Sequence, residues 1–373
     1  MAAALAGIVA ATLALHLTCC ALVLWRLRGR AAVRPGRAPE PMTVLRPVCG
    51  LDPDLARTLA TTYGTTADIE VIFCVDDADD PAIPVVRAVM AAHGTVPSRL
   101  LVGRDRISGN PKLNNLAKGW AAAAHPWIVM IDSNVLLPPD YVAQLFAGWD
   151  GAAGLVTSPP AGQEPAGLAA HLEAAFLNTY QDIWQLAGDQ VGNGFAQGKV
   201  LFWRRDILEA GGGLAALGRN LAEDVAATKV VRAAGRRVRV VTRPFAQPLG
   251  RRGLREVWDR QVRWAKVRRD GFPLVFAAEI LTGGLPPLLA TAGLVALGVA
   301  PPGAVAALVL VWYGAQWAVA ARAGWPRSAV QVAAWILRDL LIPAVWTAAL
   351  TSRGFVWRGN AMAPEAPTRA PAD

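Results

Sequence analysis

The strongest constraint on the fold is a long apolar run at the N-terminus that ends in arginines. From Ala3 to Trp25 the chain carries no charged residue, and such a run can cross a hydrocarbon core of roughly 30 Å. Arginines then follow without an acidic residue, at Arg26, Arg28, Arg30, Arg34 and Arg37. A signal peptide would carry its positive charges before the apolar run. The sequence therefore predicts a transmembrane anchor, residues 1–25, and a basic linker, residues 26–41.

Positive charge beside apolar segments predicts the orientation of the chain. Basic flanks are retained in the cytoplasm, so we expect everything after Arg26 to lie there. A second basic segment, residues 250–272, borders the C-terminal apolar region. The net charge of +9 is concentrated in these flanks, and because no nucleic-acid module accompanies it, we expect no nucleic-acid partner. We predict an integral protein of a bacterial inner membrane whose central domain lies in the cytoplasm.

Three apolar stretches in residues 272–352 predict two to three C-terminal membrane segments. The first contains Glu279 and a Gly-Gly-Leu-Pro-Pro sequence, which is typical of a broken helix. The third contains Arg338 and Asp339, which would be costly facing lipid. Three full crossings would leave the tail outside, whereas Arg353 and Arg358 favour the cytoplasm, so we expect one stretch not to be a simple crossing. We expect residues 353–373 to be disordered.

The middle of the chain, residues 42–271, alternates predicted strands and helices. The expected strands are 43–48, 69–77, 98–103 and 127–132, and the expected helices are 52–63, 79–93 and 110–124. Alternation with short connections favours a Rossmann-like α/β domain, in which helices cover both faces of a mostly parallel sheet. About 200 residues are enough for one such domain with a substantial core.

Acidic residues follow the predicted strands. Asp132 ends the apolar run WIVMI and begins an Asp-x-Asn sequence with Asn134, four aspartates lie between Asp76 and Asp80, and Glu223 and Asp224 lie further on. Carboxyl ends of parallel strands meet at one edge of a sheet. Carboxylates there can hold a divalent cation against the diphosphate of a nucleotide sugar. The alternative is that Asp132 only caps the next turn.

Asp224 begins an amphipathic helical pattern, DVAATKVVRAAG. The positively polarised N-terminus of a helix favours an ionised carboxylate. Such a carboxylate could accept the proton of an acceptor hydroxyl that attacks a sugar. The alternative is simple N-terminal capping by Asp224.

The sequence RQVRWAKVRR supplies groups suited to a phosphate and a sugar. Arg263 can make paired hydrogen bonds to phosphate oxygens, and Trp264 offers a flat apolar face. At helical spacing Arg260 shares their face. The alternative is a basic amphipathic helix on the bilayer surface, and the two interpretations can hold for opposite faces.

With these motifs in place, the chain resembles family 2-type glycosyltransferases of the GT-A fold. It is most similar to the ceramide glucosyltransferase family (glycosyltransferase family 21) and its bacterial relatives, including hopanoid-associated ones. The resemblance runs through LRPVCGLDPDL, FCVDDADDPAIPVV, GNPKLNNL, IDSNVLLPPDY, AEDVAATK and RQVRW to WILRDLL. It departs at Asn134, where the animal enzymes carry glycine, and at residues 197–203, where they carry a Gly-x-Ser-Cys region.

The resemblance implies roles for individual residues. Asp224 would be the catalytic base and Asp132 the metal-site aspartate, with Mg²⁺ or Mn²⁺ as the cation. The first aspartate motif falls at Asp80, with Asp77 as the next candidate. The remaining donor-binding candidates are Lys112, Asn114, Asn115, Arg260, Arg263 and Trp264.

The activity that the resemblance implies is an inverting transfer from a UDP-sugar to a lipid hydroxyl at the cytoplasmic membrane face. The leading pair is UDP-glucose and ceramide. The alternatives are a hopanoid-linked transferase that uses another UDP-sugar such as UDP-N-acetylglucosamine, and a polysaccharide synthase, for which the chain offers few membrane segments. A membrane scaffold or transporter subunit is the alternative outside this class, but a transporter site would lie among the spans.

Overall fold

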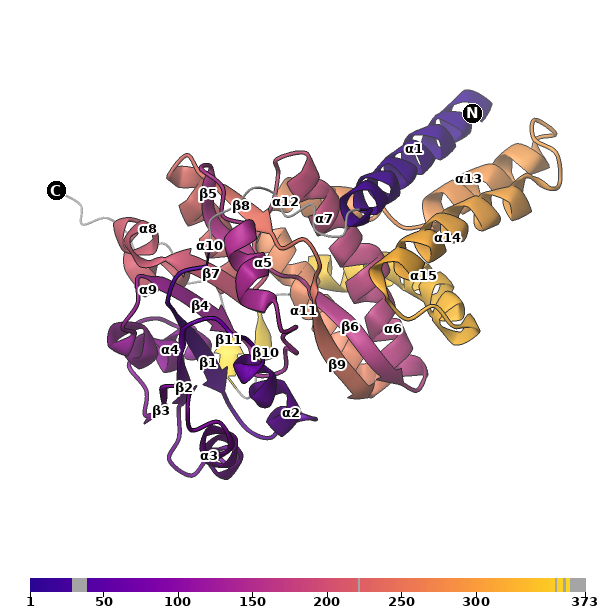
Figure 1. Ribbon diagram of the computed structural model, residues 1–373. Coiled ribbons are helices and arrows are strands. Elements are labelled where there is room, and N and C mark those ends of the chain that lie inside the picture. Colours follow the sequence, from indigo (N-terminus) through magenta and orange to yellow (C-terminus); the bar gives the residue numbers. More distant parts are fainter. Residues whose placement is uncertain (29–38, 221, 353, 358–359, 363–373) are drawn as a thin grey trace. The chain divides into compact units, whose positions relative to one another are not determined.

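The computed structural model describes residues 1–28, 39–220, 222–352, 354–357 and 360–362 (Figure 1). The chain forms two compact units from discontinuous segments. The helical unit comprises Met1–Arg30, Ala161–Gln190 and Leu249–Arg353, and the sheet unit comprises Ala31–Pro160, Val191–Pro248 and Gly354–Asp373. The continuous domain expected for residues 42–271 is therefore interrupted, because its residues 161–190 and 249–271 belong to the helical unit.

The sheet unit contains a seven-stranded sheet in the order β3-β2-β1-β4-β7-β5-β8. Its strands are β1 (Met42–Val48), β2 (Ile69–Val75), β3 (Ser98–Val102), β4 (Trp127–Ile131), β5 (Ala153–Thr157), β7 (Val200–Arg204) and β8 (Arg237–Val240). Neighbouring strands are parallel except at β7, which is antiparallel to both β4 and β5. The predicted mostly parallel sheet is confirmed. The carboxyl ends of β1, β2 and β4 lie at one edge, as expected.

Each face of this sheet is covered by helices, because the strands are apolar on both sides. Val129 and Ile131 of β4 pack in one core with α3 (Ile83–Ala92) and α5 (Tyr141–Ala147). Ile128 and Met130 pack in the other core with α4 (Pro111–Ala122) and α10 (Glu223–Ala233). Successive side chains of a strand point to opposite faces, so a continuous apolar run needs both cores. The shorter helices of this unit are α2 (Leu55–Ala60), α8 (Arg205–Ala210) and α9 (Gly213–Leu217).

The helical unit carries the apolar helices. Among the described residues, α1 (Ala2–Leu27), α14 (Ala304–Ala323) and α15 (Ala329–Thr351) are long and apolar enough to cross a membrane. The protein is therefore a membrane protein, with one N-terminal and two C-terminal candidate spans. The first C-terminal stretch is broken, as its sequence predicts, into α12 (Pro273–Glu279) and α13 (Leu285–Ala296). The other helices of the unit are α6 (Leu168–Phe176), a π-helical segment (Leu177–Asp182), α7 (Ile183–Gln190) and α11 (Leu254–Gly271), and a separate small sheet pairs β6 (Pro160–Ala166) with β9 (Phe245–Arg251).

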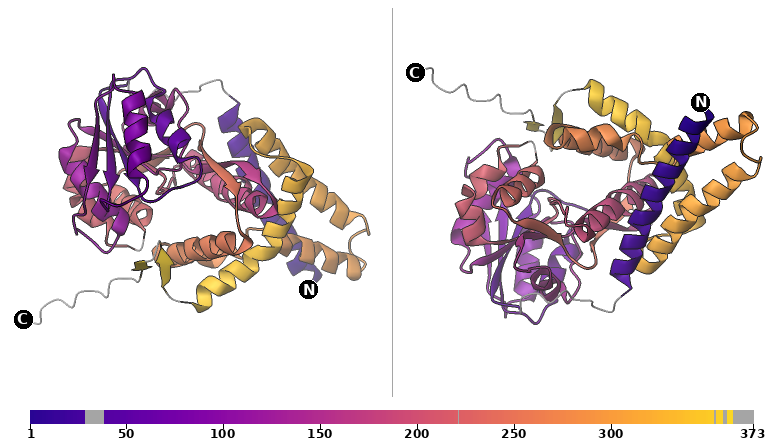
Figure 2. Two further views of the ribbon diagram at one scale, coloured as in Figure 1. Left: turned by 90° about the horizontal axis from the view of Figure 1, so that it is seen from below. Right: turned by 90° about the horizontal axis from the view of Figure 1, so that it is seen from above.

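Helices α1, α13 and α14 pack against one another (Figures 1 and 2). The His16 ring stacks on Trp312 with centroids 3.8 Å apart, and Arg322 donates to the Arg28 carbonyl, so α1 and α14 run in the same direction. Leu5 contacts the position of Gly293, near the C-terminal end of α13. Helix α13 therefore runs opposite to α1 and α14. Helix α15 packs instead along α6 and α11.

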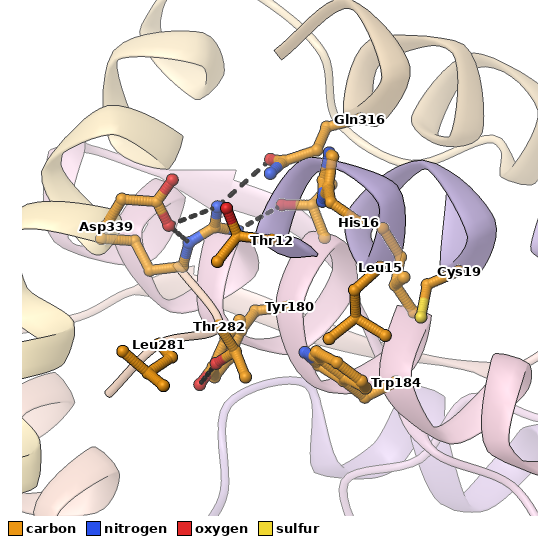
Figure 3. Close-up of a pocket in the computed structure, with 13 residues that line it drawn as sticks. Thr12, Leu15, His16, Cys19, Tyr180, Trp184, Leu281, Thr282, Gln316 and Asp339 are labelled. Carbon is orange, nitrogen blue, oxygen red and sulfur yellow. Dashed lines mark hydrogen bonds and ion pairs between the residues drawn. The ribbon is translucent and has the colours of Figure 1, made fainter. Parts of the chain in front are cut away.

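The charged pair in α15 is buried inside the helical unit. Arg338 donates to Asp339, the Ala175 carbonyl, Thr179 and Gln316, and Asp339 accepts from the Tyr313 hydroxyl at 3.0 Å. Figure 3 shows Gln316, Asp339 and His16 around a small pocket beside α1. Because every charge in the pair has hydrogen-bond partners, the expected cost of facing lipid is avoided.

Two further expectations concern the chain's ends, the basic linker and the disordered tail. Arg26 of the basic linker is buried in an ion pair with Asp189 of α7, with Nη1 and Oδ2 2.7 Å apart. Residues 29–38 of that linker lie outside the described residues. The tail expected to be disordered contains a short antiparallel pair, β10 (Phe355–Trp357) with β11 (Asn360–Met362). That expectation overlooked the aromatic and β-branched sequence FVW, which favours a strand, while residues 363–373 lie outside the described residues.

Candidate active site

The loop after β4 places Asp132 between two lysines. Lys112 Nζ lies 2.6 Å from Asp132 Oδ1, and Lys199 Nζ lies 3.0 Å from Asp132 Oδ2. Lys199 also donates to Asn134 Oδ1 at 2.9 Å, so it contacts both polar residues of the Asp-x-Asn sequence. Burial alone would raise the pKa of Asp132, but the two ammonium groups hold it well below its ordinary value. Asp132 is therefore ionised at neutral pH.

Lys112 joins four segments of the sheet unit. From the first turn of α4 it reaches Asp132, the Gly198 carbonyl at 2.6 Å and Glu223 Oε1 at 2.7 Å. Burial would lower the pKa of Lys112, but Asp132 and Glu223 raise it above its ordinary value. Asn110, the N-cap of α4, donates to the other oxygen of Glu223 at 3.1 Å. The Lys112 ammonium is thus the centre of the polar cluster.

Asp224 lies next to this cluster, as the second residue of α10. Its Oδ2 accepts from the Gly198 N–H at 3.1 Å and its Oδ1 from the Val225 N–H at 2.8 Å. The N-cap of α10 is Ala222, so Asp224 is not the capping residue. Burial and then Glu223 raise the pKa of Asp224 to about 6, and they outweigh the backbone N–H groups that lower it. A carboxyl with this pKa suits general-base catalysis near neutral pH.

The donor set fits a divalent cation in its chemistry. Asp132 and Asn134 offer a carboxylate and an amide oxygen, the hard ligands that Mg²⁺ and Mn²⁺ prefer. Among the described residues, no group of three or more His, Cys, Asp or Glu side chains is arranged to hold a metal. Two protein ligands are nevertheless sufficient where substrate phosphates complete the coordination.

The first aspartate motif is arranged differently from the expectation that favours Asp80. Both Asp80 oxygens accept from the Gly50 N–H, at 3.0 and 2.9 Å, and Oδ1 also accepts from the Ala82 N–H. Asp80 therefore ties the loop after β1 to the start of α3. Asp77 is exposed and accepts from the Asp79 N–H. The more accessible carboxylate of the two is thus Asp77.

Asn114 and Asn115 are both buried, and their amides are engaged within the protein. Asn114 accepts from the Ile107 and Ser108 N–H groups and donates to the Ser108 carbonyl. Asn115 donates to the Cys74 carbonyl at the end of β2 and accepts from Lys118. These contacts favour positioning roles over direct contact with a donor: Asn114 holds the loop at 105–110, and Asn115 ties α4 to the end of β2.

The RQVRW sequence lies on α11 of the helical unit. Arg260 donates to the buried Glu173 and to Glu256. Trp264 packs on a small apolar cluster formed by Ala170, Ala174, Leu177 and Leu249. Arg263 has no hydrogen-bond or ion-pair partner among the described residues, and burial together with Arg260 lowers its pKa to about 10. Of the three residues, Arg263 keeps a charged group available for a ligand.

Sequence reasoning assigned no individual role to Lys199, Gly198, Glu223 or Asn110. Gly198 is required by space, because an added Cβ would lie 2.7 Å from Glu223 Oε1. The sequence did contain a signal for Gly198 and Lys199. The apolar run VLFW follows them directly and is typical of a buried strand that begins at Val200. The acid pair Glu223-Asp224 was visible, but its partner Lys112 is more than 100 residues away in sequence.

The Gly198→Ala substitution should destabilise the sheet unit by roughly 1–3 kcal/mol. The new methyl group would push Glu223 away from Lys112 and Asn110, which fix its position. Thermal unfolding of the purified protein measures the effect. Gly151→Ala is the matched control, since its Cβ would meet nothing within 4 Å. Equal unfolding midpoints for the two variants would show that Glu223 is not held as described.

The chain belongs to glycosyl transferase family 21, whose model matches residues 2–369. It is therefore a glycosyltransferase. It is 25% identical over 330 residues to "Ceramide glucosyltransferase 3" of Caenorhabditis elegans, an alignment that covers 86% of this chain and 72% of that protein. It is 34% identical over 109 residues to "Ceramide glucosyltransferase" of Candida albicans, which covers 26% of this chain and 20% of that protein.

Among solved structures, the chain is similar to the mannosyltransferase PcManGT from Pyrobaculum calidifontis in complex with GDP-Man and Mn²⁺. The TM-score is 0.56 at 20% sequence identity, and the match covers 93% of this chain and 99% of that chain. At this identity the similarity establishes the fold. The GT-A fold expected from the sequence is confirmed.

Proposed function

We propose that the protein transfers glucose from UDP-glucose to the hydroxyl group of ceramide, giving glucosylceramide with inversion at the anomeric carbon. The observation that carries this proposal is Asp224, a carboxyl with a pKa of about 6 beside the cluster of Lys112, Asp132 and Lys199. Membership of family 21 supports the reaction class. The two relatives named ceramide glucosyltransferase support the sugar and the lipid.

In this mechanism Asp224 in its carboxylate form accepts the proton of the ceramide hydroxyl. The hydroxyl oxygen forms a bond to the anomeric carbon as the bond from that carbon to the diphosphate breaks, and UDP leaves with the electron pair. The Gly198 and Val225 N–H groups orient the carboxylate, and its pKa near 6 leaves it largely ionised at neutral pH.

Positive charge for the leaving diphosphate comes from the chain's own residues in this proposal. Lys112 and Lys199 are the candidate phosphate contacts of the sheet unit, and Arg263 is a separate candidate on the helical unit. Asp77 is the more accessible candidate nucleotide contact of the first aspartate motif. Asp132 and Asn134 would hold a Mg²⁺ or Mn²⁺ ion, which supplies Lewis-acid stabilisation of the departing UDP. We assign Asp80, Asn114, Asn115, Arg260 and Trp264 to positioning these groups, because their described contacts are within the protein.

For the membrane topology, we propose that α1 and α14 cross the bilayer, that the broken α12–α13 stretch carries the chain to the outer face between them, and that α15 is not a simple crossing and ends on the cytoplasmic side. The basic residues Arg26 and Arg28 favour a cytoplasmic location for the C-terminal end of α1. Helix α14 runs in the direction of α1, so the chain has to reach the outer face through α13 before α14 returns. Helix α15 then packs along α6 and the charged α11. The tail with Arg358 would be cytoplasmic.

This topology predicts that the Val299→Cys variant, altered in the loop between α13 and α14, is labelled in intact cells by a membrane-impermeant maleimide. Val299 is 61% exposed, so the new thiol would be accessible. The native exposed Cys49 is the internal control and should react only after lysis. If the thiol introduced at Val299 also reacted only after lysis, the loop between α13 and α14 would not lie on the outer face of the membrane.

Lipid mass spectrometry of a host that expresses the protein, supplied with both ceramide and hopanoid acceptors, tests the proposed reaction. Hexosylceramide should appear with the wild-type protein and disappear with Asp224→Asn. A glycosylated hopanoid instead would keep the mechanism and replace the acceptor. The absence of any new glycolipid would contradict the proposed function.

A further inference from the structure

The sheet register brings Lys199 to the Asp-x-Asn sequence. Strands β4 and β7 are antiparallel with Ile131 opposite Val200, so the next residues along, Asp132 and Lys199, also face each other. The Asp132 N–H donates to the Lys199 carbonyl at 3.0 Å. The position of Lys199 is therefore set by backbone hydrogen bonds of the sheet, and its side chain is 16% exposed.

The Lys199 ammonium contacts the same two side chains that would hold a divalent cation. It lies 3.0 Å from Asp132 Oδ2 and 2.9 Å from Asn134 Oδ1. A divalent cation on these oxygens would sit within a few ångströms of the ammonium, and like charges at that separation repel strongly in a partly buried site. The ammonium and the cation therefore compete for Asp132 and Asn134.

Lys112 is anchored by contacts outside the Asp-x-Asn sequence. Lys112 is also bound to the Gly198 carbonyl and to Glu223, so these contacts keep it in place if Asp132 takes another partner. Its side chain is 9% exposed, about half the value for Lys199. Of the two lysines that contact Asp132, Lys199 is thus the one bound by both polar side chains of the Asp-x-Asn sequence, Asp132 and Asn134.

We propose that Lys199 couples the binding of the cation to the binding of the nucleotide. Without nucleotide, its ammonium neutralises Asp132 and opposes cation binding. When a nucleoside diphosphate binds, the ammonium pairs with a phosphate oxygen and leaves Asp132 and Asn134 to the cation. This inference rests on the proposed function, since it requires a nucleoside diphosphate at this edge of the sheet. By linkage, each ligand strengthens the other by the same factor.

The test uses the full-length protein in detergent, with Mn²⁺ and UDP as probes. Electron paramagnetic resonance of unbound Mn²⁺ gives the Mn²⁺ affinity with and without UDP. We expect UDP to strengthen Mn²⁺ binding to the wild-type protein by roughly tenfold or more, the effect of one nearby charge. In Lys199→Met, Mn²⁺ alone should bind about tenfold more tightly, and the gain from UDP should fall by the same factor to what the phosphates contribute as ligands of the cation.

Lys229→Met is the matched control, because it removes the same charge from an exposed lysine of α10. It should behave like the wild-type protein. Lys199→Gln also removes the charge but keeps a hydrogen-bond donor. It should show the Mn²⁺ affinity expected of Lys199→Met, and it replaces that variant if Lys199→Met folds poorly. If the Lys199 variants bound Mn²⁺ no more tightly than the wild-type protein in the absence of UDP, the inference would be wrong.

The outcome also separates this inference from the proposed function. If the wild-type protein binds UDP and forms glycolipid, but Lys199→Met shows the same Mn²⁺ affinity and the same gain from UDP, the coupling role of Lys199 is wrong and the transferase proposal stands. If UDP does not bind at all, the proposed function fails together with the inference.

Discussion

Asp224→Asn should reduce glucosyl transfer by about 10²–10⁴-fold, the usual contribution of a general base. The amide cannot accept the proton of the acceptor hydroxyl. It is close in shape to the carboxylate, although only its oxygen can accept from the Gly198 or Val225 N–H group. UDP binding should therefore remain within a few-fold of wild type. Steady-state kinetics with UDP-glucose and ceramide, together with UDP binding by calorimetry, measure both parts.

The control for charge removal is Asp206→Asn in the same unit. Asp206 is 58% exposed and forms a surface ion pair with Arg204, which contributes little to stability. Its transfer rate should match wild type. Retained transfer in Asp224→Asn, or a parallel loss of UDP binding, would remove Asp224 from the role of base.

The same carboxyl predicts the acidic limb of the pH profile. Because burial and Glu223 raise the pKa of Asp224 to about 6, kcat/KM should fall as the pH drops through about 6, where the base becomes protonated. Above that pH the carboxylate form dominates and the rate should level off. The limb reports the Asp224–Glu223 pair, so Glu223→Gln, which removes the neighbouring charge, should move it to lower pH. An unmoved limb would show that Glu223 does not raise this pKa.

The second large effect is expected at Lys112. Lys112→Met keeps most of the side-chain length but leaves Glu223 without its ammonium partner and Asp132 with one lysine instead of two. Breaking a buried ion pair by removing one partner costs about 3–5 kcal/mol. We therefore expect a large fall in the unfolding midpoint and loss of transfer activity.

Two comparisons make the Lys112 result interpretable. Lys229→Met should leave the unfolding midpoint unchanged, since this lysine is exposed. The double variant Lys112→Met with Glu223→Met should recover part of the stability, because it no longer leaves a buried carboxylate without a counter-charge. If Lys112→Met alone unfolded like wild type, Lys112 would not be the centre of the cluster.

The sheet unit was largely predictable because its signals are local. The run WIVMI predicts a strand buried on both faces, and the structure places it between two apolar cores with Asp132 at its carboxyl end. The broken first C-terminal stretch was predictable from its Gly-Gly-Leu-Pro-Pro sequence in the same way. These features depend on residues close together in the chain.

The partners of the site residues were not predictable, because they depend on register and packing between distant segments. Lys199 reaches Asp132 only because β7 is antiparallel to β4 in one particular register. Arg260 was expected to bind the donor, but its partner Glu173 lies in a segment that no local pattern separates from the α/β domain. The burial of Arg26 against Asp189 depends on the same segment.

The proposed reaction is a direct displacement at the anomeric carbon, with Asp224 as the base. Proton NMR of the purified glycolipid made from α-linked UDP-glucose and ceramide tests it most directly. A β-glucoside, recognised by the large coupling between the protons on C1 and C2, is the predicted product. An α-glucoside would contradict the proposal, because a single backside displacement with Asp224 as the base inverts the anomeric carbon.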